Sequence, residues 1–360
     1  MRGAAEGAGT WRSDGPGSGP VTEPRASTDT TAGTPPIPSW ALVATVSVLS
    51  LVAALLWVVI PHGDPSPTVV SERGAASGPY TGPDRLIGAA GDIACDPKNR
   101  FFGKDPPVAG NCHAEATAAL LKRANVERVL ALGDNQYEAA TLADYRASYA
   151  RSWGTLKSIT YPVAGNHEYY TRGADGYFHY FGKVAGKPRQ GWYSFDIGAW
   201  HLVALNSNCN DVDCFAGSDQ EKWLRDDLRA HPTKCTLAFW HAPLFSSGPE
   251  GEKRSVRPLW NALYAAGVDV VVNGHNHNYE RFAPQNPSGG RDPTRGIREF
   301  VVGTGGDNLQ GFPNPVPNSE VRIRDTFGVL LVRLKANGYD WNFTPERPDG
   351  QSDVGSASCH

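Results

Sequence analysis

The amino-acid sequence predicts a layered α/β fold, and three observations support this prediction. Five apolar runs each end in a polar signature, and helical patterns lie between them. Runs without polar alternation are typical of strands buried on both faces, and strands that alternate with helices of this size indicate α/β layers. Further strand-like segments late in the chain indicate a second sheet packed on the first.

The predicted strands are these apolar runs and several shorter segments. The five central runs lie at residues 86–92, 129–134, 161–167, 236–241 and 268–275. An antiparallel hairpin is expected from the segments 192–196 and 200–206, which an Ile-Gly-Ala turn joins. Later strands are expected at 299–303, 327–335 and 339–344.

The predicted helices are amphipathic or rich in alanine and leucine. They lie at residues 113–124, 142–153, 218–230 and 255–266. The third begins with Ser218 and has Glu221 three residues later. This is the pattern of a capping box, in which each side chain accepts a hydrogen bond from the other residue's backbone amide.

Composition limits the organisation of the 360-residue chain. Residues 1–39 are rich in Gly, Ala, Pro, Ser and Thr and are expected to be disordered, and residues 61–84 are interpreted as a linker. A single domain is assigned to 85–345, followed by a loose polar tail at 346–360. The net charge of −3 and the lack of a basic stripe give no sign of nucleic-acid binding.

Residues 40–60 carry no charge and predict a transmembrane anchor. A helix of this length spans about 30 Å, which matches the hydrocarbon core of a bilayer. Trp40 and Trp57 lie near its ends, where aromatic rings are favoured. The alternative is a cleaved signal peptide followed by secretion. It is less favoured because a signal peptide has an apolar region of about 7–15 residues, and Ile60-Pro61-His62 is a poor cleavage site.

The six cysteines indicate an oxidising compartment and therefore a domain outside the cytoplasm. No Cys-x2-Cys motif supports a zinc ribbon. Cys235 begins an apolar run and is expected to be a buried thiol, whereas Cys359 lies in the polar tail with no assigned partner. The other four form close pairs that suit two local disulfides, Cys95 with Cys112 and Cys209 with Cys214.

Polar side chains follow all five central runs, at the strand ends where functional groups collect in α/β sheets. Gly-Asp and Gly-Asn after a strand are ordinary turn chemistry, and a lone histidine there is more often a hydrogen-bonding residue. Five strand ends that all carry metal-ligand types are poorly explained in this way. Carboxylate, amide and imidazole groups together suit iron, zinc or manganese. The residues are Asp92, Asp134, Asn166, His167, His241, His275 and His277.

The residues lie in the ordered motifs Gly-Asp92-Ile-Ala, Gly-Asp134-Asn-Gln-Tyr137, Gly-Asn166-His167-Glu168, Trp-His241-Ala-Pro and Gly-His275-Asn-His277-Asn-Tyr-Glu-Arg281. These motifs resemble those of calcineurin-like metallophosphoesterases, and more narrowly those of purple acid phosphatases. Tyr137 and the Tyr-Glu-Arg continuation point to that branch. The first motif also lacks the histidine that follows the aspartate in most other branches. The resemblance covers residues 85 to about 335 and implies a four-layer α/β/β/α sandwich of two mixed sheets flanked by helices.

The resemblance implies two metal ions, iron plus a divalent ion (Fe, Zn or Mn), with Asp134 as the bridge. The other ligands of the first ion would be Asp92, Tyr137 and His277, and those of the second Asn166, His241 and His275. A tyrosine bound to ferric iron would colour the protein purple. For Tyr137 the alternative is a phenol at the edge of the core.

The resemblance implies that His167 holds the phosphate and protonates the leaving oxygen, or hydrogen-bonds the nucleophile. The alternative for His167 is support of Asn166. Plant and animal purple acid phosphatases carry a further histidine in the loop after His241, and residues 244–258 contain none. Lys253 or Arg254 of that loop could supply charge, but a solvated loop face is the favoured interpretation. The polar residues that the loop offers instead of a histidine are Ser246, Ser247, Glu250, Lys253 and Arg254. The separate N-terminal β-domain of the family is not expected, because the anchor and linker occupy its position.

We therefore expect a membrane-anchored, extracytoplasmic dinuclear metallophosphatase that acts on small phosphorylated substrates. The expected reaction is acid-phosphatase-like hydrolysis of phosphate monoesters by in-line attack of a metal-bound hydroxide. A phosphodiesterase or nucleotide hydrolase is the nearest alternative, because a fold and its ligands do not determine the substrate. A non-catalytic surface-binding module that keeps the metals for structure is less favoured, because it would not need His167.

Overall fold

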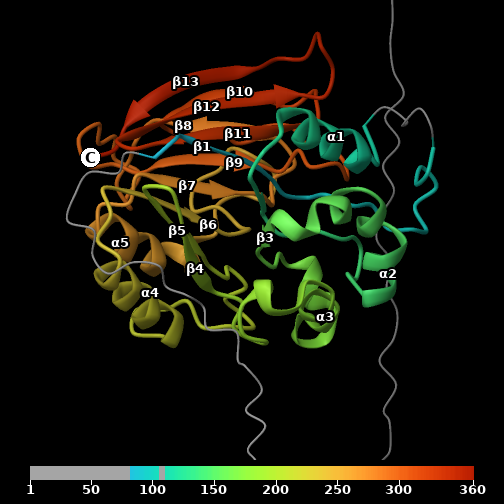
Figure 1. Cartoon of the computed structure of the whole chain (residues 1–360), viewed down its shortest axis with the longest axis horizontal. Coiled ribbons are helices and arrows are strands. Elements are labelled where there is room, and N and C mark those ends of the chain that lie inside the picture. Colours follow the sequence, from blue (N-terminus) through green and yellow to red (C-terminus); the bar gives the residue numbers. More distant parts are fainter. Residues whose placement is uncertain (1–81, 105–109) are drawn as a thin grey trace, which may run out of the picture. The chain divides into compact units, whose positions relative to one another are not determined.

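A computed structural model of the protein describes residues 82–104 and 110–360 (Figure 1). The predicted disordered segment 1–39 and the predicted anchor 40–60 lie outside the described residues, as does the linker up to residue 81. Within the described ranges, no helix combines the length and the apolar character needed to cross a membrane.

Two mixed sheets form the centre of the domain (Figure 1). The first has the strand order β13 (Asp353–Ser358), β12 (Gly338–Pro345), β11 (Gly328–Lys335), β1 (Arg85–Ala90), β2 (Arg128–Ala131) and β3 (Thr160–Pro162). The second has the order β10 (Ser319–Ile323), β8 (Tyr279–Phe282), β9 (Arg298–Val302), β7 (Val270–Asn273), β6 (Cys235–Phe239), β5 (Trp200–Ala204) and β4 (Tyr193–Ile197).

Both sheets contain a parallel group whose carboxyl ends meet at one edge. In the first sheet β1, β2 and β3 are parallel, and in the second β5, β6, β7 and β9 are parallel. The remaining pairings are antiparallel. Loops that follow the parallel strands are therefore brought together, which is the arrangement that builds functional sites in α/β proteins.

Helices cover the outer faces of the sheets. Figure 1 shows α4 (Asp219–Ala230) and α5 (Arg257–Ala265) side by side at one end of the view, and α1 (Ala114–Ala124), α2 (Leu142–Ala147) and α3 (Asp175–Phe181) grouped at the other. Gly88 of β1 lies under α1, because a Cβ atom there would be 2.2 Å from the Leu121 side chain. The predicted α/β sandwich of two mixed sheets flanked by helices is confirmed.

Successive side chains along each strand point to opposite faces of the sheet, so the core forms separate clusters on the two faces. In β5, Leu202 packs in a cluster shared with the first sheet, whereas its neighbour Val203 packs in a second cluster. That second cluster contains Leu224 of α4 and Leu263 of α5. The two faces of the second sheet are thus both buried, which explains the unalternated apolar runs in the sequence.

Several elements differ from the sequence-based expectation. The predicted helix 142–153 is helical only to Ala147 and continues as 3₁₀ turns at Tyr149–Arg151 and Trp153–Ile159. Strands β8, β10 and β13 and helix α3 were not predicted. The capping box of α4 forms in half: Ser218 Oγ accepts a bond from Glu221 N at 3.3 Å, but the Glu221 carboxylate accepts from Gly217 N.

The prediction of a loose tail at 346–360 is wrong, and the domain does not end at residue 345. Strand β13 pairs antiparallel with β12, and the buried Asp353 carboxylate accepts hydrogen bonds from Tyr279 Oη at 2.7 Å and Trp341 Nε1 at 3.1 Å. The tail escaped prediction because its residues are small or polar and lack an apolar pattern, while their partners lie far away in the sequence.

The predicted disulfides Cys95–Cys112 and Cys209–Cys214 are both formed. The prediction of a free buried thiol at Cys235 is wrong, because Cys235 forms a third disulfide with Cys359. The two cysteines are 124 residues apart in the sequence, and β13 brings Cys359 back to the start of β6. All six cysteines are therefore paired.

Candidate metal centre

The predicted ligands follow five strands and converge at the common edge of the two sheets. They lie directly beyond the ends of β1, β2, β3, β6 and β7. The structure brings together all eight residues selected from the sequence, which are Asp92, Asp134, Tyr137, Asn166, His167, His241, His275 and His277.

Tight turns direct these side chains into a shared space. Asp92, Asp134 and His275 have φ values of 60°, 44° and 73°, in the left-handed region that residues with a Cβ atom rarely adopt. Gly165 allows the close approach of Asp134, because a Cβ atom there would lie 2.1 Å from Asp134 Oδ1 and 2.3 Å from Asp134 N. Strain of this kind at several positions is typical of functional sites.

One group of ligand atoms surrounds the phenol oxygen of Tyr137. That oxygen lies 3.0 Å from Asp92 Oδ1, 3.2 Å from Asp134 Oδ2 and 3.0 Å from His277 Nε2. His277 Nε2 is also 3.2 Å from Asp92 Oδ1. These four residues form the set that the sequence assigned to the first metal ion.

A second group of ligand atoms surrounds Nε2 of His241. That nitrogen lies 3.2 Å from Asp134 Oδ2, 3.2 Å from Asn166 Oδ1 and 3.1 Å from His275 Nδ1. The ligand atoms of Asp134, His241 and His275 lie close enough together to hold one ion. The two groups share a single atom, Oδ2 of Asp134.

The spacing and chemistry of both groups fit metal ions. Ligand atoms that are each about 2.0–2.2 Å from a common ion lie about 3.0–3.5 Å from one another. The observed separations of 3.0–3.2 Å fall in this range. Oxygen and nitrogen donors of this kind suit iron, zinc or manganese.

Hydrogen bonds on the far side of two imidazoles support the same conclusion. His241 Nδ1 lies 2.9 Å from Leu132 O, and His277 Nδ1 lies 2.7 Å from Asn308 Oδ1. Because both partners are acceptors, each neutral ring carries its proton on Nδ1 and points the Nε2 lone pair at carboxylate oxygens. A cation bound between these nitrogen and oxygen atoms would remove the repulsion between their lone pairs. Hydrogen bonds from the far side of the ring, such as these, are typical of metal-bound histidines.

The buried carboxylates of Asp92 and Asp134 favour positive charge within the two ligand groups. Burial disfavours the charged imidazole, but Asp134 outweighs it and raises the pKa of His241 to about 9, and Asp92 likewise raises that of His277 to about 9. Burial and the neighbouring His241 lower the pKa of His275 to about 4. Without a metal ion, protons on two imidazoles therefore supply the charge that cations would otherwise supply.

His167 is placed beside both groups without belonging to either. Its Nδ1 lies 2.7 Å from Glu138 O and its Nε2 lies 3.9 Å from Asp134 Oδ2. The ring packs between those of Tyr137 and Tyr170, at centroid distances of 4.3 and 4.6 Å. The side chain is 16% exposed, so a ligand bound at the shared carboxylate can reach Nε2.

Glu168 is a functional residue that the sequence analysis missed. Its buried carboxylate accepts bonds from the backbone amides of Asp134 at 2.9 Å, Asn135 at 2.9 Å and Gly165 at 2.6 Å, and from Tyr145 Oη at 2.8 Å. Burial and the Asp134 charge raise its pKa to about 7. Glu168 thus joins the turns after β2 and β3. Its place directly after His167 was the only sequence signal.

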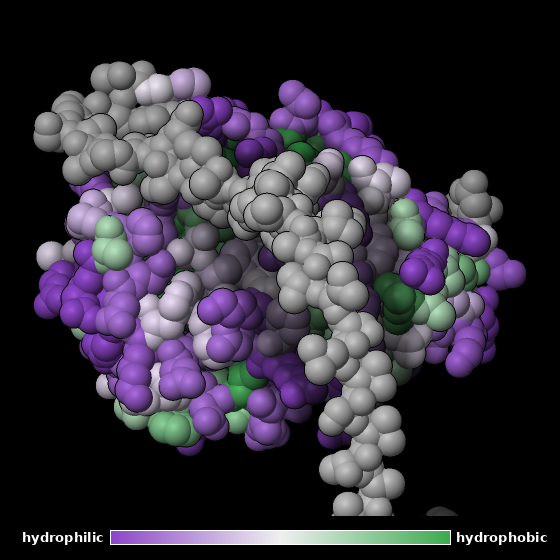
Figure 2. Space-filling model, turned by 60° about the horizontal axis from the view of Figure 1, so that its bottom comes forward, coloured by the Kyte–Doolittle hydropathy of each residue, from purple (hydrophilic) through white to green (hydrophobic). Residues whose placement is uncertain are grey.

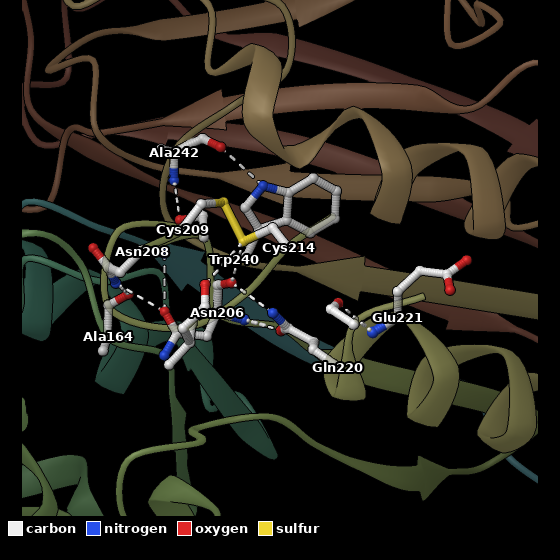
Figure 3. The surroundings of a disulfide bond; sticks show 12 residues. Ala164, Asn206, Asn208, Cys209, Cys214, Gln220, Glu221, Trp240 and Ala242 are labelled. Atoms are coloured by element: carbon white, nitrogen blue, oxygen red, sulfur yellow. Dashed lines mark hydrogen bonds between the residues drawn. A yellow bond between two sulfur atoms is a disulfide. The ribbon is translucent and has the colours of Figure 1, made fainter. Parts of the chain in front are cut away.

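A buried polar network holds two further ligand turns together (Figure 3). Asn208 Nδ2 donates to Ala164 O at 3.2 Å, just before the Asn166 turn, and Ser207 Oγ accepts from Ala242 N at 2.9 Å, just after His241. The disulfide Cys209–Cys214 closes the loop that follows this segment. The sequence predicted the disulfide but not its relation to the ligands.

The loop after His241 agrees with the favoured interpretation of its charged residues. Arg254 is 80% exposed at its side chain and pairs with Glu252 at 3.4 Å. Ser246 and Ser247 are buried and hydrogen-bond within the loop and to Val316 N. None of these contacts reaches the ligand groups.

Arg281, which had no assigned role, is structural. Its Nε donates to Asp353 Oδ2 at 2.7 Å, and its guanidinium also pairs with Glu320 and lies 5.1 Å from the Trp341 ring centre. The Tyr-Glu-Arg continuation of the last motif therefore anchors β13 to the second sheet.

The fold and the two linked ligand groups define a protein with the architecture of a metallophosphoesterase. A sequence model described as calcineurin-like phosphoesterase matches residues 86–279, more than half of the chain, and the chain belongs to this family.

Relatives among known proteins include purple acid phosphatases. The chain is similar to purple acid phosphatase 22 of Arabidopsis thaliana, with 38% identity over 148 residues, which cover 38% of this chain and 32% of that protein. Purple acid phosphatase 21 of the same plant is 43% identical over 157 residues, covering 40% and 34%. The chain thus spans about a third of the length of these plant relatives.

Solved structures show the same fold. A purple acid phosphatase from yellow lupin seeds matches with a TM-score of 0.63 and 19% identity, over 78% of this chain and 55% of that one. GAP50, the anchor in the inner membrane complex of Plasmodium, matches with a TM-score of 0.55 and 15% identity, over 77% of this chain and 89% of that one.

Proposed function

We propose that this chain is a dinuclear metal-dependent phosphoesterase that hydrolyses phosphate monoesters in the manner of an acid phosphatase. One observation carries the proposal. Oδ2 of Asp134 lies 3.2 Å from Tyr137 Oη on one side and 3.2 Å from His241 Nε2 on the other, so a single carboxylate links two ligand groups. Family membership and the similarity to purple acid phosphatases support it.

In this proposal each of the two ligand groups holds one metal ion. Asp92, Tyr137 and His277 complete the first site, and Asn166, His241 and His275 complete the second. Two ions held by these residues would supply an activated water and neutralise charge on the phosphoryl group. The identity of the metals is proposed as iron with a divalent ion, because a phenolate is part of the set.

His167 is proposed as the general acid. Glu138 O accepts the Nδ1 proton at 2.7 Å, which fixes the ring so that Nε2 faces the position above Asp134. A proton held on Nε2 can pass to the leaving oxygen of an ester bound there. The loop at 244–258 contains no histidine, so the further histidine of plant and animal purple acid phosphatases has no counterpart there.

Parallel assays with 4-nitrophenyl phosphate and bis(4-nitrophenyl) phosphate test the proposal. The monoesterase account predicts faster hydrolysis of the monoester by protein that contains two metal equivalents, and loss of both metals and activity in Asp134→Ala. Preference for the diester would support the phosphodiesterase alternative, and an active metal-free protein would refute the dinuclear account.

The same fold occurs in GAP50, the anchor in the inner membrane complex of Plasmodium. A non-catalytic surface-binding module is therefore tested by the same assays, because it would bind metals without hydrolysing either ester.

We also propose that the domain works in an oxidising, extracytoplasmic compartment, anchored by residues 40–60. The three disulfides support the compartment.

A further inference from the structure

A cavity of about 820 Å³ opens next to the turn that carries His167. One wall is formed by Thr171, Arg172, Gly173 and Asp175, continued by Phe178 and His179 of α3, and another by Pro188 and Arg189. His167–Tyr170 forms a 3₁₀ helix, which rises about 2 Å per residue, so Thr171 begins the wall about 8 Å from His167. The cavity is therefore within reach of a substrate whose phosphate lies at the candidate metal centre.

Two arginines line this cavity, one on each of these two segments of the chain. Arg172 and Arg189 are both exposed. Among the residues that the structure describes, neither has a hydrogen bond or an acidic partner. The acidic residue of the cavity, Asp175, lies 3.1 Å from His179 Nδ1 rather than against either arginine. The two guanidiniums thus leave their positive charge available to a ligand.

The two walls are held in place by one buried side chain. Asn206 Nδ2 donates to Tyr169 Oη at 2.7 Å, three residues before Arg172, and to Gln190 O at 2.9 Å, next to Arg189. Asn206 itself is fixed by Gln220, which accepts from Asn206 N at 2.7 Å and donates to Asn206 O at 3.0 Å (Figure 3). The separation between the backbones that carry the two arginines is therefore set by the folded core.

The side of the molecule that carries α3 is largely polar. Figure 2 looks onto the side on which α3 and α4 lie in Figure 1, and the described residues that are visible there are mostly hydrophilic. The large exposed hydrophobic residues within the described ranges are Tyr170, Phe215 and Val354, which are far apart in the sequence. Tyr170 directly precedes Thr171 in the sequence, and its ring lies 4.6 Å from that of His167.

We propose that this cavity is a subsite for a second phosphate group, so that the preferred substrates are phosphate monoesters whose leaving group carries a further phosphate. The inference rests on the proposed phosphoesterase function and specifies its substrate class. Arginine binds phosphate through parallel N–H donors and keeps its charge at any physiological pH. The metal centre takes the scissile phosphate, and Arg172 and Arg189 take the second one.

The test compares fructose 1,6-bisphosphate with fructose 1-phosphate, which lacks the second phosphate. Loss of charge-assisted hydrogen bonds to two arginines is expected to lower the ratio of the two kcat/KM values by roughly tenfold or more in Arg172→Gln/Arg189→Gln. The change is expected mainly in KM. Arg123→Gln on α1, an exposed arginine outside the cavity, is the matched control and is expected to keep the wild-type ratio. Added salt should shrink the wild-type preference, because exposed charges are screened.

A binding measurement separates this inference from the proposed function. Metal-loaded His167→Ala protein is titrated with inositol hexakisphosphate by calorimetry, with and without the two arginine substitutions. The subsite predicts binding that is at least about tenfold weaker without the arginines. Equal binding by both proteins, or an unchanged ratio of kcat/KM values, would overturn the subsite. Failure of the wild-type protein to hydrolyse any of these esters while the binding difference persists would instead refute the phosphoesterase assignment alone.

Discussion

The phenol oxygen of Tyr137 lies 3.0 Å from Nε2 of His277, although 140 residues separate the two in the sequence. Tyr137 follows β2 of the first sheet and His277 follows β7 of the second, so the contact joins the two sheets at their common edge. Their rings also pack edge to face, at a centroid distance of 5.8 Å. The proposed metal ion shared by the two residues accounts for this approach, and the proposal can be tested together with the structure around it.

Substitution His167→Ala separates catalysis from metal binding. The variant is expected to keep two metal equivalents, because His167 lies outside both ligand groups, and to lose about 10²–10⁴-fold in kcat, the usual contribution of a general acid. Steady-state assays with 4-nitrophenyl phosphate and metal analysis give the two readouts. His231→Ala, an exposed histidine at the end of α4, serves as the control and should retain activity. Full activity of His167→Ala would remove this residue from the reaction.

Substitution Asn208→Ala tests the polar network that joins the turns after β3 and β6. Asn208 Nδ2 bridges Ala164 O and Asn206 Oδ1, at 3.2 and 2.9 Å. Loss of such supporting hydrogen bonds typically costs about 10–100-fold in metal affinity, and here the second site should be affected while the first is kept. Calorimetric metal titration measures both sites. Asn342→Ala, exposed on β12, should behave as wild type, and equal weakening of both sites would contradict this role.

Stability should depend on pH through His201, which lies between two carboxylates. Its Nδ1 is 2.8 Å from Asp196 Oδ1 and its Nε2 is 2.9 Å from Asp227 Oδ2. Burial opposes the charged ring, but these hydrogen bonds raise the pKa of His201 to about 9. Because the folded pKa is the higher one, the stabilisation is complete below the ordinary histidine value of about 6.5 and is lost as the pH rises through about 9.

The free energy of unfolding of wild type should therefore exceed that of His201→Gln by on the order of 3 kcal/mol at pH 6 and by much less at pH 10. Urea unfolding at the two pH values measures the difference. A difference that does not change with pH would mean that His201 is neutral in the folded protein.

Substitution Asp353→Ala tests the attachment of the C-terminal strand. The change leaves Arg281, Tyr279 and Trp341 without their shared acceptor, and breaking a buried charge pair typically costs about 3–5 kcal/mol. Thermal and urea unfolding give the magnitude. Asp349→Ala, whose side chain is 82% exposed, should change stability little. If Asp353→Ala were as stable as wild type, the C-terminal strand would contribute little to stability, as expected of a loose tail.

The ligand residues could be predicted from the sequence because each lies in a short motif at the end of an apolar run. Local rules are enough there, since a strand end and a tight turn fix the position of Asp92, Asp134 or His275 within a few residues. The resemblance to a known family then assigned Tyr137, which no turn rule singles out.

Residues that act through distant partners could not be predicted. Asn308 orients His277, and Asp353 holds Arg281, across 31 and 72 residues of sequence. The pairing of Cys235 with Cys359 depends on β13, whose small polar residues carry no apolar periodicity. Tertiary pairing decides these contacts, and a single sequence has no local signal for them.

Metal analysis combined with a visible spectrum tests the central claim most directly. Wild-type protein is expected to contain two metal equivalents, iron among them, with a visible absorption band that Tyr137→Phe removes and a metal content that Asp134→Ala reduces toward zero. The band and the stoichiometry together would place Tyr137 on iron and Asp134 between two ions. One metal equivalent or none in active protein, or a spectrum that Tyr137→Phe leaves unchanged, would contradict the account.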